Sequence, residues 1–223
     1  MQTYQEILNI AADRKGGKDA VLADMPKVLS ADDLAAIPDN RWLAQMARGI
    51  FQAGISWQVV ENKWVGIEEA FYNFDVGRVA VMSEDWFDEL LDDPRIVRSP
   101  PKVEAIQHNA AFIQEVAAEA GSFGRKIGDW PAEDFAGLLE WLKKNGSRLG
   151  GATGAYALRY LGKESYVLSP SVVARLEAEG VIDKEPTSKK AMAAVQAAFN
   201  AWKAESGESL TVISRVLAQS IDG

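Results

Sequence analysis

A glycine-rich turn in the second half of the chain has the residue pattern best suited to hold a phosphate. Residues 149–154 read LGGATG, so backbone N–H groups are exposed with almost no side chain in front of them. A helix starting at this turn would direct the positive end of its dipole at an anion. Three basic side chains crowd the same end of an otherwise acidic chain. The pattern indicates contact with a nucleic-acid backbone, without reading of the bases, through Lys143, Lys144, Arg148, Gly150, Gly151, Thr153 and Gly154.

Two helices should flank this turn. Apolar residues at helical spacing predict a first helix from about Ala132 to Lys144 and a second from about Ala152 to Leu161. Together they would form a helical hairpin over about residues 132–162. The same residues are also typical of an ordinary pair of antiparallel helices joined by a glycine loop, and they leave both interpretations open.

A second candidate for chemistry lies in FQAGISWQVV, residues 51–60. A glycine stop is followed by Ser56 as a helix cap, which places Trp57 in the first turn of a helix. A flat ring there could stack on a base while Gln52 hydrogen-bonds the base edge. The competing interpretation is that the tryptophan belongs to the core, because it begins an apolar stripe of helical spacing. The stripe consists of Trp57, Val60, Trp64, Ile67 and Phe71.

The composition limits the possible functions. The chain of 223 residues is long enough for a buried core, and its 48% apolar and 25% charged residues are typical of a globular protein. No apolar run approaches the roughly 18 residues of a membrane span, so we expect neither a membrane helix nor a signal peptide. The lack of cysteine favours the cytoplasm and, with a single histidine, argues against a zinc site. Because the net charge is −8, any nucleic-acid contact must be a local basic patch.

Helix signals recur along the whole chain, and no segment reads as a convincing strand. Pro38 separates a short helix from a longer one over about residues 40–53, for which Asp39 is the predicted N-cap. Two closing helices are predicted near 188–204 and 209–220. The sequence therefore predicts an all-α protein with roughly ten to twelve helices, most of them short.

Four segments, in order, resemble the DNA-3-methyladenine glycosylases of type I, a family of the helix–hairpin–helix superfamily of base-excision repair enzymes. They are QAGISWQVVENKW, FYNFDVGRVAVM, DDPRIVRSPPKVEAIQHNAAFI with GSF, and LKKNGSRLGGATGAYAL, and they span roughly residues 40–172. The resemblance implies one glycosylase-like domain over residues 1–223, with two helical lobes and both termini in one of them. It implies an enzyme that flips an alkylated purine such as 3-methyladenine out of duplex DNA and hydrolyses its glycosidic bond. We expect it to act as a monomer.

The resemblance also assigns site residues. Trp57 would line a base pocket between the lobes, Gln52 would lie beside it, and Tyr156 matches a family tyrosine. Gly49 stands where the family usually has a glutamate, so extra space and looser selectivity for adenine are expected there. Ser169 stands at the place of the superfamily's catalytic aspartate. The family's Cys and His zinc ligands have no counterparts, whereas a monovalent cation at the hairpin turn is compatible with the pattern.

With both expected acids absent, Glu61 is the remaining candidate for a catalytic carboxylate, since it lies one helical turn after Trp57. Asp39 is a weaker alternative. A cationic alkylpurine leaves easily, so binding and flipping could supply most of the rate. Two other functions stay open: a non-catalytic DNA-binding relative that senses damage, and a helical protein-interaction module, which the acidic charge favours.

Overall fold

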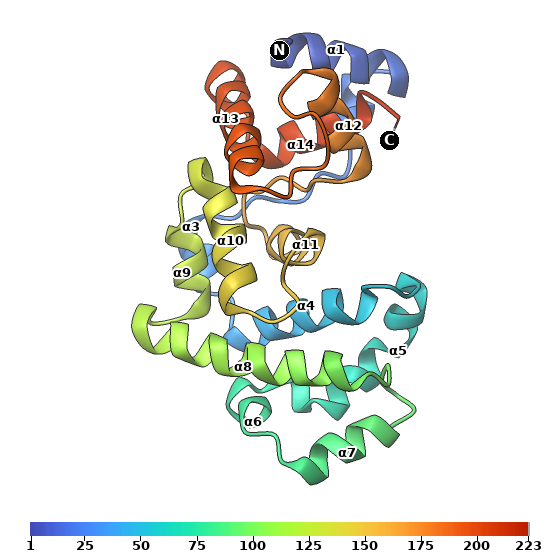
Figure 1. The fold of residues 1–223 in the computed structure, drawn as a ribbon, viewed down its shortest axis with the longest axis vertical. Coiled ribbons are helices and arrows are strands. Elements are labelled where there is room, and N and C mark those ends of the chain that lie inside the picture. The colour runs from blue at the N-terminus through green and yellow to red at the C-terminus, as the bar shows by residue number, and fades with distance from the viewer. Residues whose placement is uncertain (223) are drawn as a thin grey trace. The chain divides into compact units, whose positions relative to one another are not determined.

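The computed structural model describes residues 1–222, and every regular element within them is a helix (Figure 1). The predicted all-α fold class is confirmed. These residues form fourteen α-helices and two 3₁₀ helices, which exceeds the expected ten to twelve. The difference comes from short helices such as α2 (Lys18–Leu22), whose five residues are too few to show a helical period in the sequence. Helix α6 (Val76–Ala80) is equally short but follows an N-cap aspartate, Asp75, which predicts it.

The chain divides into two compact units. The first unit contains residues 1–29 and 130–138 and continues from Gly162 to the end of the described residues, so it holds both the first and the last of the described residues. The second contains residues 30–129 and 139–161.

The first unit is built around α14, which packs against four other helices of the unit. Its core includes a stack of aromatic rings in which Tyr166 lies 4.4 Å from Phe199, centroid to centroid, and meets Phe135 edge-on. Burial raises the pKa of the Tyr166 hydroxyl far above its ordinary value. The elements of this unit are α1 (Tyr4–Lys15), α2, the 3₁₀ helix η2 (Ala132–Asp134), α12 (Pro170–Ala178), α13 (Lys189–Ser206) and α14 (Leu210–Gln219).

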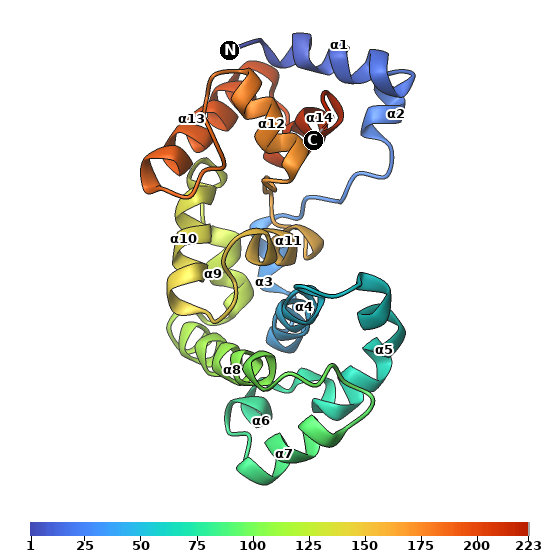
Figure 2. The same cartoon turned by 45° about the vertical axis from the view of Figure 1, so that its right-hand side comes forward.

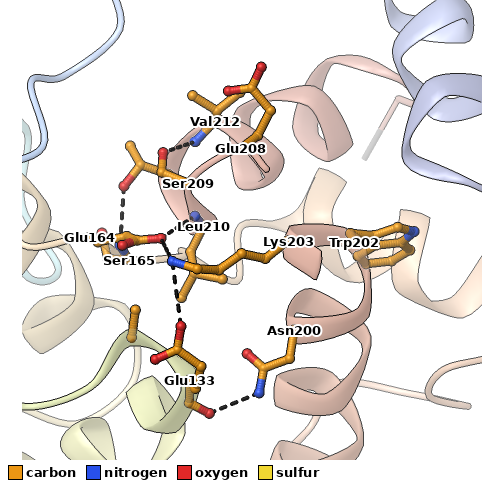
Figure 3. Close-up of polar contacts among 12 residues, drawn as sticks. Glu133, Glu164, Ser165, Asn200, Trp202, Lys203, Glu208, Ser209, Leu210 and Val212 are labelled. Carbon is orange, nitrogen blue, oxygen red and sulfur yellow. Dashed lines mark hydrogen bonds and ion pairs between the residues drawn. The ribbon is translucent and has the colours of Figure 1, made fainter. Parts of the chain in front are cut away.

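Charged side chains in the first unit hold backbone in place (Figure 3). Glu164 accepts a hydrogen bond from the Lys203 ammonium at 2.6 Å and another from the Leu210 backbone N–H at 2.9 Å, at the start of α14. The neighbouring Ser165 N–H donates to the Thr211 hydroxyl at 3.1 Å. The extended segment before α12 is thereby fixed to α14 by polar groups that point into the unit.

The second unit is organised by two long helices, α4 (Asp39–Gln52) and α8 (Pro100–Ala120), which pack against each other (Figure 2). Helix α6 covers α8, while α5 and α11 pack on α4. The remaining elements are α3 (Ala31–Ala35), α5 (Trp57–Ala70), η1 (Tyr72–Phe74), α7 (Glu84–Asp92), α9 (Phe123–Asp129) and α11 (Ala152–Tyr160). Helix α10 (Phe135–Asn145) begins in the first unit and ends in the second.

The prediction that Asp39 caps α4 is wrong. Pro38 occupies the N-cap position, and Asp39 lies inside the first turn. Its Oδ1 instead accepts the backbone N–H of Phe123 at 2.9 Å, at the start of α9. Partial burial raises the pKa of the Asp39 carboxyl, although the hydrogen bond from Phe123 opposes the shift. Asp39 therefore joins two helices of the second unit.

Candidate nucleic-acid interface and base site

The predicted hairpin is present, with α10 and α11 on either side of residues 146–151. The first helix begins later than expected, because η2 occupies residues 132–134 and the α-helix starts at Phe135. The second helix runs from Ala152 to Tyr160, close to the predicted range.

The turn of the hairpin is held by α8. The buried Asn109 amide donates from Nδ2 to the Ser147 carbonyl at 3.0 Å, and its Oδ1 accepts the Ser147 N–H at 2.7 Å. The neighbouring His108 places Nε2 3.0 Å from the Asn145 carbonyl, and Leu149 is buried. Because one side chain satisfies both backbone groups of a turn residue, the turn is preorganised.

Three backbone N–H groups at the start of α11 are free. Within the described part of the chain, nothing accepts a hydrogen bond from the N–H of Gly150, Gly151 or Ala152. Gly151 has a φ of +59° and no atom within 4 Å of the place a Cβ would take, so the approach to these groups is open. Free N–H groups at the N-terminus of a nine-residue helix suit a phosphate.

The three predicted basic side chains surround this turn and are exposed. Lys143 and Lys144 lie in the last turn of α10, and the Lys143 stem runs beside Gly150. Arg148 donates from Nε to the Pro101 carbonyl at 3.1 Å, at the start of α8. Lysines in a last helical turn also interact favourably with the helix dipole, so they serve the helix as well as a bound anion.

The sequence suggested a turn without close side-chain packing, but two of its residues, Thr153 and Gly154, are in close contact with neighbouring groups. Gly154 is buried, and a Cβ there would lie 2.4 Å from the Leu149 carbonyl oxygen, so a close approach of turn and helix requires glycine. The Thr153 methyl group faces α4. Both residues serve packing within the second unit.

Trp57 is 62% exposed at the start of α5, so its interpretation as a core residue is wrong. The rest of the stripe behaves as predicted for Val60, Ile67 and Phe71, which are fully buried. Ser56 takes the N-cap position, but its side chain makes no capping hydrogen bond. A large flat ring thus stands in solvent, where it is free to stack on a ligand.

Beside Trp57, the side chains of α4 and α5 form a polar cluster around Glu61. Gln52 donates from Nε2 to Glu61 Oε1 at 3.0 Å, and Arg48 Nε lies 3.6 Å from the same oxygen. The Arg48 guanidinium also lies over the Trp64 ring, 4.2 Å from its centroid. The sequence reasoning found Gln52 and Glu61 but missed Arg48. The sequence did contain a signal for Arg48, namely a repeated spacing of arginine and glutamate. Arg41 lies seven residues before Arg48 and Glu68 lies seven residues after Glu61, and these two form a similar ion pair between the same helices.

Tyr156 is exposed on α11, and its ring stacks on Tyr160 at 6.0 Å and 22°. Partial burial and the neighbouring Tyr156 raise the pKa of the Tyr160 hydroxyl, with smaller effects from Glu61 and Arg48. Tyr160 therefore lies within electrostatic range of Glu61 and Arg48. Tyr160 was not predicted, although its spacing of four residues from Tyr156 on one helix face could have indicated it.

The extra space expected at Gly49 is absent. A Cβ on Gly49 would lie 3.1 Å from the Thr153 Cγ2 atom, so α11 already occupies the place where a side chain would begin. The prediction of a vacancy beside Trp57 is therefore wrong. Close packing of α4 on α11 accounts for the glycine.

The remaining candidates are accounted for by structure. Ser169 caps α12 by accepting the Val172 N–H at 3.4 Å. No group of three or more His, Asp or Glu side chains in residues 1–222 could hold a metal ion. A zinc ion does not fit the available donors, because the chain has no cysteine and the only histidine contacts the Asn145 carbonyl. Across residues 1–222, the helices are too short or too polar to cross a bilayer.

The chain is similar to known glycosylases in sequence. The methyladenine glycosylase family pattern matches residues 37–134. DNA-3-methyladenine glycosylase 1 of Escherichia coli (strain K12) is 39% identical over 64 residues. That match covers 28% of this chain and 34% of the relative, so the chain aligns with about a third of that protein's length.

Solved structures extend the similarity to the fold. A variant of 3-methyladenine DNA glycosylase I in complex with 3-methyladenine is 25% identical, with a TM-score of 0.51, over 73% of this chain and 96% of that one. The enzyme from Staphylococcus aureus is 24% identical, with a TM-score of 0.51, over 70% and 91%. The 8-oxoguanine glycosylase/lyase of Methanocaldococcus jannaschii, solved with a 15-mer DNA, shares the fold at 12% identity, with a TM-score of 0.51, over 95% of both chains. The resemblance inferred from the sequence motifs is thereby confirmed: the chain carries the methyladenine glycosylase pattern on an all-α fold that solved glycosylases share.

Proposed function

We propose that this protein is a DNA glycosylase that removes alkylated purines of the 3-methyladenine type from duplex DNA. The family pattern and the relatives support this class of enzyme. In the reaction, the bond between the purine N9 and the sugar C1′ breaks, and its electron pair leaves with the base. Water adds to C1′ and loses a proton, which yields the free base and an abasic site. A purine that carries a positive alkylated ring leaves as a neutral molecule, so its departure needs less help than that of an ordinary base.

The exposed Trp57 carries the proposal. Its ring stands in solvent in the first turn of α5 in the second unit, one helical turn before Glu61 on the same helix. An electron-rich ring attracts a cationic purine by roughly 0.5 to 2 kcal/mol. The free N–H groups of the hairpin turn and its lysines belong to the same unit and would grip the phosphates beside the flipped nucleotide.

We assign Glu61 as the carboxylate that acts on the flipped base. It lies four residues after Trp57 on α5 and is held to α4 by Gln52, whereas Asp39 is bound to Phe123 at the other end of α4. Neither the Gly49 nor the Ser169 position offers a carboxylate. We further propose a monomeric cytoplasmic enzyme that works without zinc, and a monovalent cation at the hairpin turn stays a prediction.

The test is incubation of the protein with duplex DNA methylated at purine nitrogens, followed by chromatography of the released bases. We expect release of 3-methyladenine above the spontaneous rate, and a loss of release in Trp57→Ala. If the protein binds duplex DNA in a salt-dependent manner but releases no base, the chain is a damage-binding relative rather than an enzyme. If it neither binds DNA nor releases bases, the proposal is wrong altogether.

A further inference from the structure

We propose that Arg48 is a positioning residue, which holds Glu61 against α4 so that Glu61 Oε2 can accept a hydrogen bond from the amino group of a bound purine. The carboxylate at this place would then come from α5 rather than from residue 49. The inference rests on the proposed function, because it names the group that recognises the base in that reaction.

The two contacts to Glu61 converge on one oxygen. Gln52 Nε2 and Arg48 Nε both approach Oε1, at 3.0 and 3.6 Å. No side chain or backbone group in residues 1–222 donates a hydrogen bond to Oε2, and the side chain is 39% exposed. A carboxylate that is anchored through one oxygen presents the other to solvent as a ready acceptor.

Arg48 is itself held by an aromatic ring of α5. Its guanidinium lies over Trp64, and the Trp64 ring stacks in turn on the buried Phe74 at 5.7 Å and 15°. The Arg48 Nε atom is buried and has no hydrogen-bond partner in the described residues, so its pairing with Glu61 is the contact that balances its charge. A charge fixed in this way can hold Glu61 in one place.

The position of the cluster on α4 identifies the role. Arg48 precedes Gly49 directly, and Gln52 follows it by three residues, so both project from the same turn of the helix. Thr153 closes the surface at Gly49 itself. The Glu61 carboxylate thus contacts side chains of the same helical turn that contains Gly49, where a side chain of residue 49 would press on Thr153. Contrary to the sequence expectation, an acceptor for an adenine amino group is present.

The same two helices provide a matched control. Arg41 and Glu68 form an ion pair at 2.5 Å between α4 and α5, two helical turns from Arg48 and Glu61. The two pairs have the same residue types and join the same elements. They differ in their neighbours, because Gln52 hydrogen-bonds Glu61 and Gly49 directly follows Arg48, whereas the Arg41 pair has no such partners within residues 1–222.

The experiment compares Arg48→Met, Arg48→Lys and Glu61→Gln with the controls Arg41→Met and Glu68→Gln. Each variant is assayed for kcat and KM on duplexes that carry 3-methyladenine or 7-methylguanine, which has no 6-amino group. Arg48→Met and Glu61→Gln should each lower kcat/KM for 3-methyladenine by about 10- to 100-fold, the size expected for a lost hydrogen bond to a charged group. The loss should be smaller for 7-methylguanine, and Arg48→Lys should recover most of the activity.

The double variant Arg48→Met with Glu61→Gln tests whether Arg48 acts through Glu61. It should lose no more activity than Glu61→Gln alone, because a positioning residue has no effect once its target is gone. The controls should change kcat/KM by less than about twofold, as is usual for a surface ion pair. Additive losses, or an Arg48→Met enzyme that behaves like Arg41→Met, would overturn the inference and leave the proposed function intact. A parent protein that releases no base overturns both.

Discussion

Glu164 in the first unit and Glu61 in the second are both carboxylates paired with a basic side chain, yet they are used differently. The Glu164 side chain is 18% exposed, and it accepts hydrogen bonds from Lys203 and from the Leu210 N–H at a helix start. The Glu61 side chain is 39% exposed, and its partners are the side chains of Gln52 and Arg48 rather than backbone groups. Interior pairs of the first kind hold backbone together, while an anchored and exposed carboxylate is free to meet a ligand.

The tryptophans repeat this contrast. Trp202 of α13 is fully buried in the first unit, whereas Trp57 of α5 is 62% exposed in the second. We therefore expect substitutions in the first unit to lower stability, and substitutions on the α4, α5 and α11 side chains near Glu61 to lower activity. Three sets of variants can test this division.

The largest effect should come from the tryptophan pair. Trp202→Ala should lower the free energy of unfolding by about 3–5 kcal/mol, because it empties a packed core. Trp57→Ala should change it by less than about 1 kcal/mol, since most of the side chain is already in water. The same Trp57→Ala should reduce release of 3-methyladenine by about 10- to 100-fold through lost stacking. Urea unfolding and base-release assays measure the two quantities; a strongly destabilised Trp57→Ala would contradict the division.

A smaller effect is expected from two glycines with positive φ and open surroundings. Gly151 at the hairpin turn and Gly180 in the first unit have φ of +59° and +69°, and neither has an atom within 4 Å of an added Cβ. Aspartate at either position should cost about 1 kcal/mol of stability because of the backbone conformation. Only Gly151→Asp should weaken duplex DNA binding, by roughly tenfold at low salt, because the new charge repels phosphate at the free N–H groups.

Fluorescence anisotropy with labelled duplex DNA at several salt concentrations measures this difference. Gly180→Asp controls for strain and for the added negative charge. Equal affinities of the two variants would show that the hairpin turn is not the DNA contact.

The smallest effect concerns Asp39. Its pKa is raised by burial above the ordinary 3.8, so the folded state holds the proton more tightly than the unfolded state. The contribution of the Asp39 carboxyl to the free energy of unfolding therefore falls as the pH rises from about its pKa in the unfolded state through its pKa in the folded state. Asp39→Asn keeps an oxygen for the Phe123 N–H and removes the buried charge. The variant should be slightly more stable than the parent at pH 7, and the difference should disappear as the pH falls toward 4. A difference that grows on acidification would contradict the assignment.

The hairpin and most helices were predictable because local signals specify them. Ser30, Ser83 and Ser188 each cap a helix with the side chain, as such residues usually do. The apolar stripe of α5 correctly placed Val60 and Ile67 in the core. The stripe was wrong for Trp57, and Trp64 is only half-buried, because helical periodicity cannot reveal where a neighbouring helix ceases to cover the stripe.

The candidate site was only partly predictable. Gln52, Trp57 and Glu61 follow from a motif and from spacing on one or two helices. Arg48 and Tyr160 matter through contacts between α4, α5 and α11, and single-sequence patterns do not specify which helices pack together. The Asn109 amide that holds the hairpin turn is likewise 38 residues from its partner, Ser147, in the sequence.

The contact between Gly49 and Thr153 has a consequence for how this chain could acquire a glutamate at position 49. A side chain there would press on the Thr153 methyl, and overpacking of this kind typically costs about 1–3 kcal/mol. Restoring the glutamate by one substitution would therefore disturb α11, the helix that follows the hairpin turn. A smaller residue at 153 would have to come first, so the order of mutations is constrained. Once Glu61 is paired with Arg48, a second acid at position 49 would also add a like charge to the same cluster, and selection would have little reason to keep it.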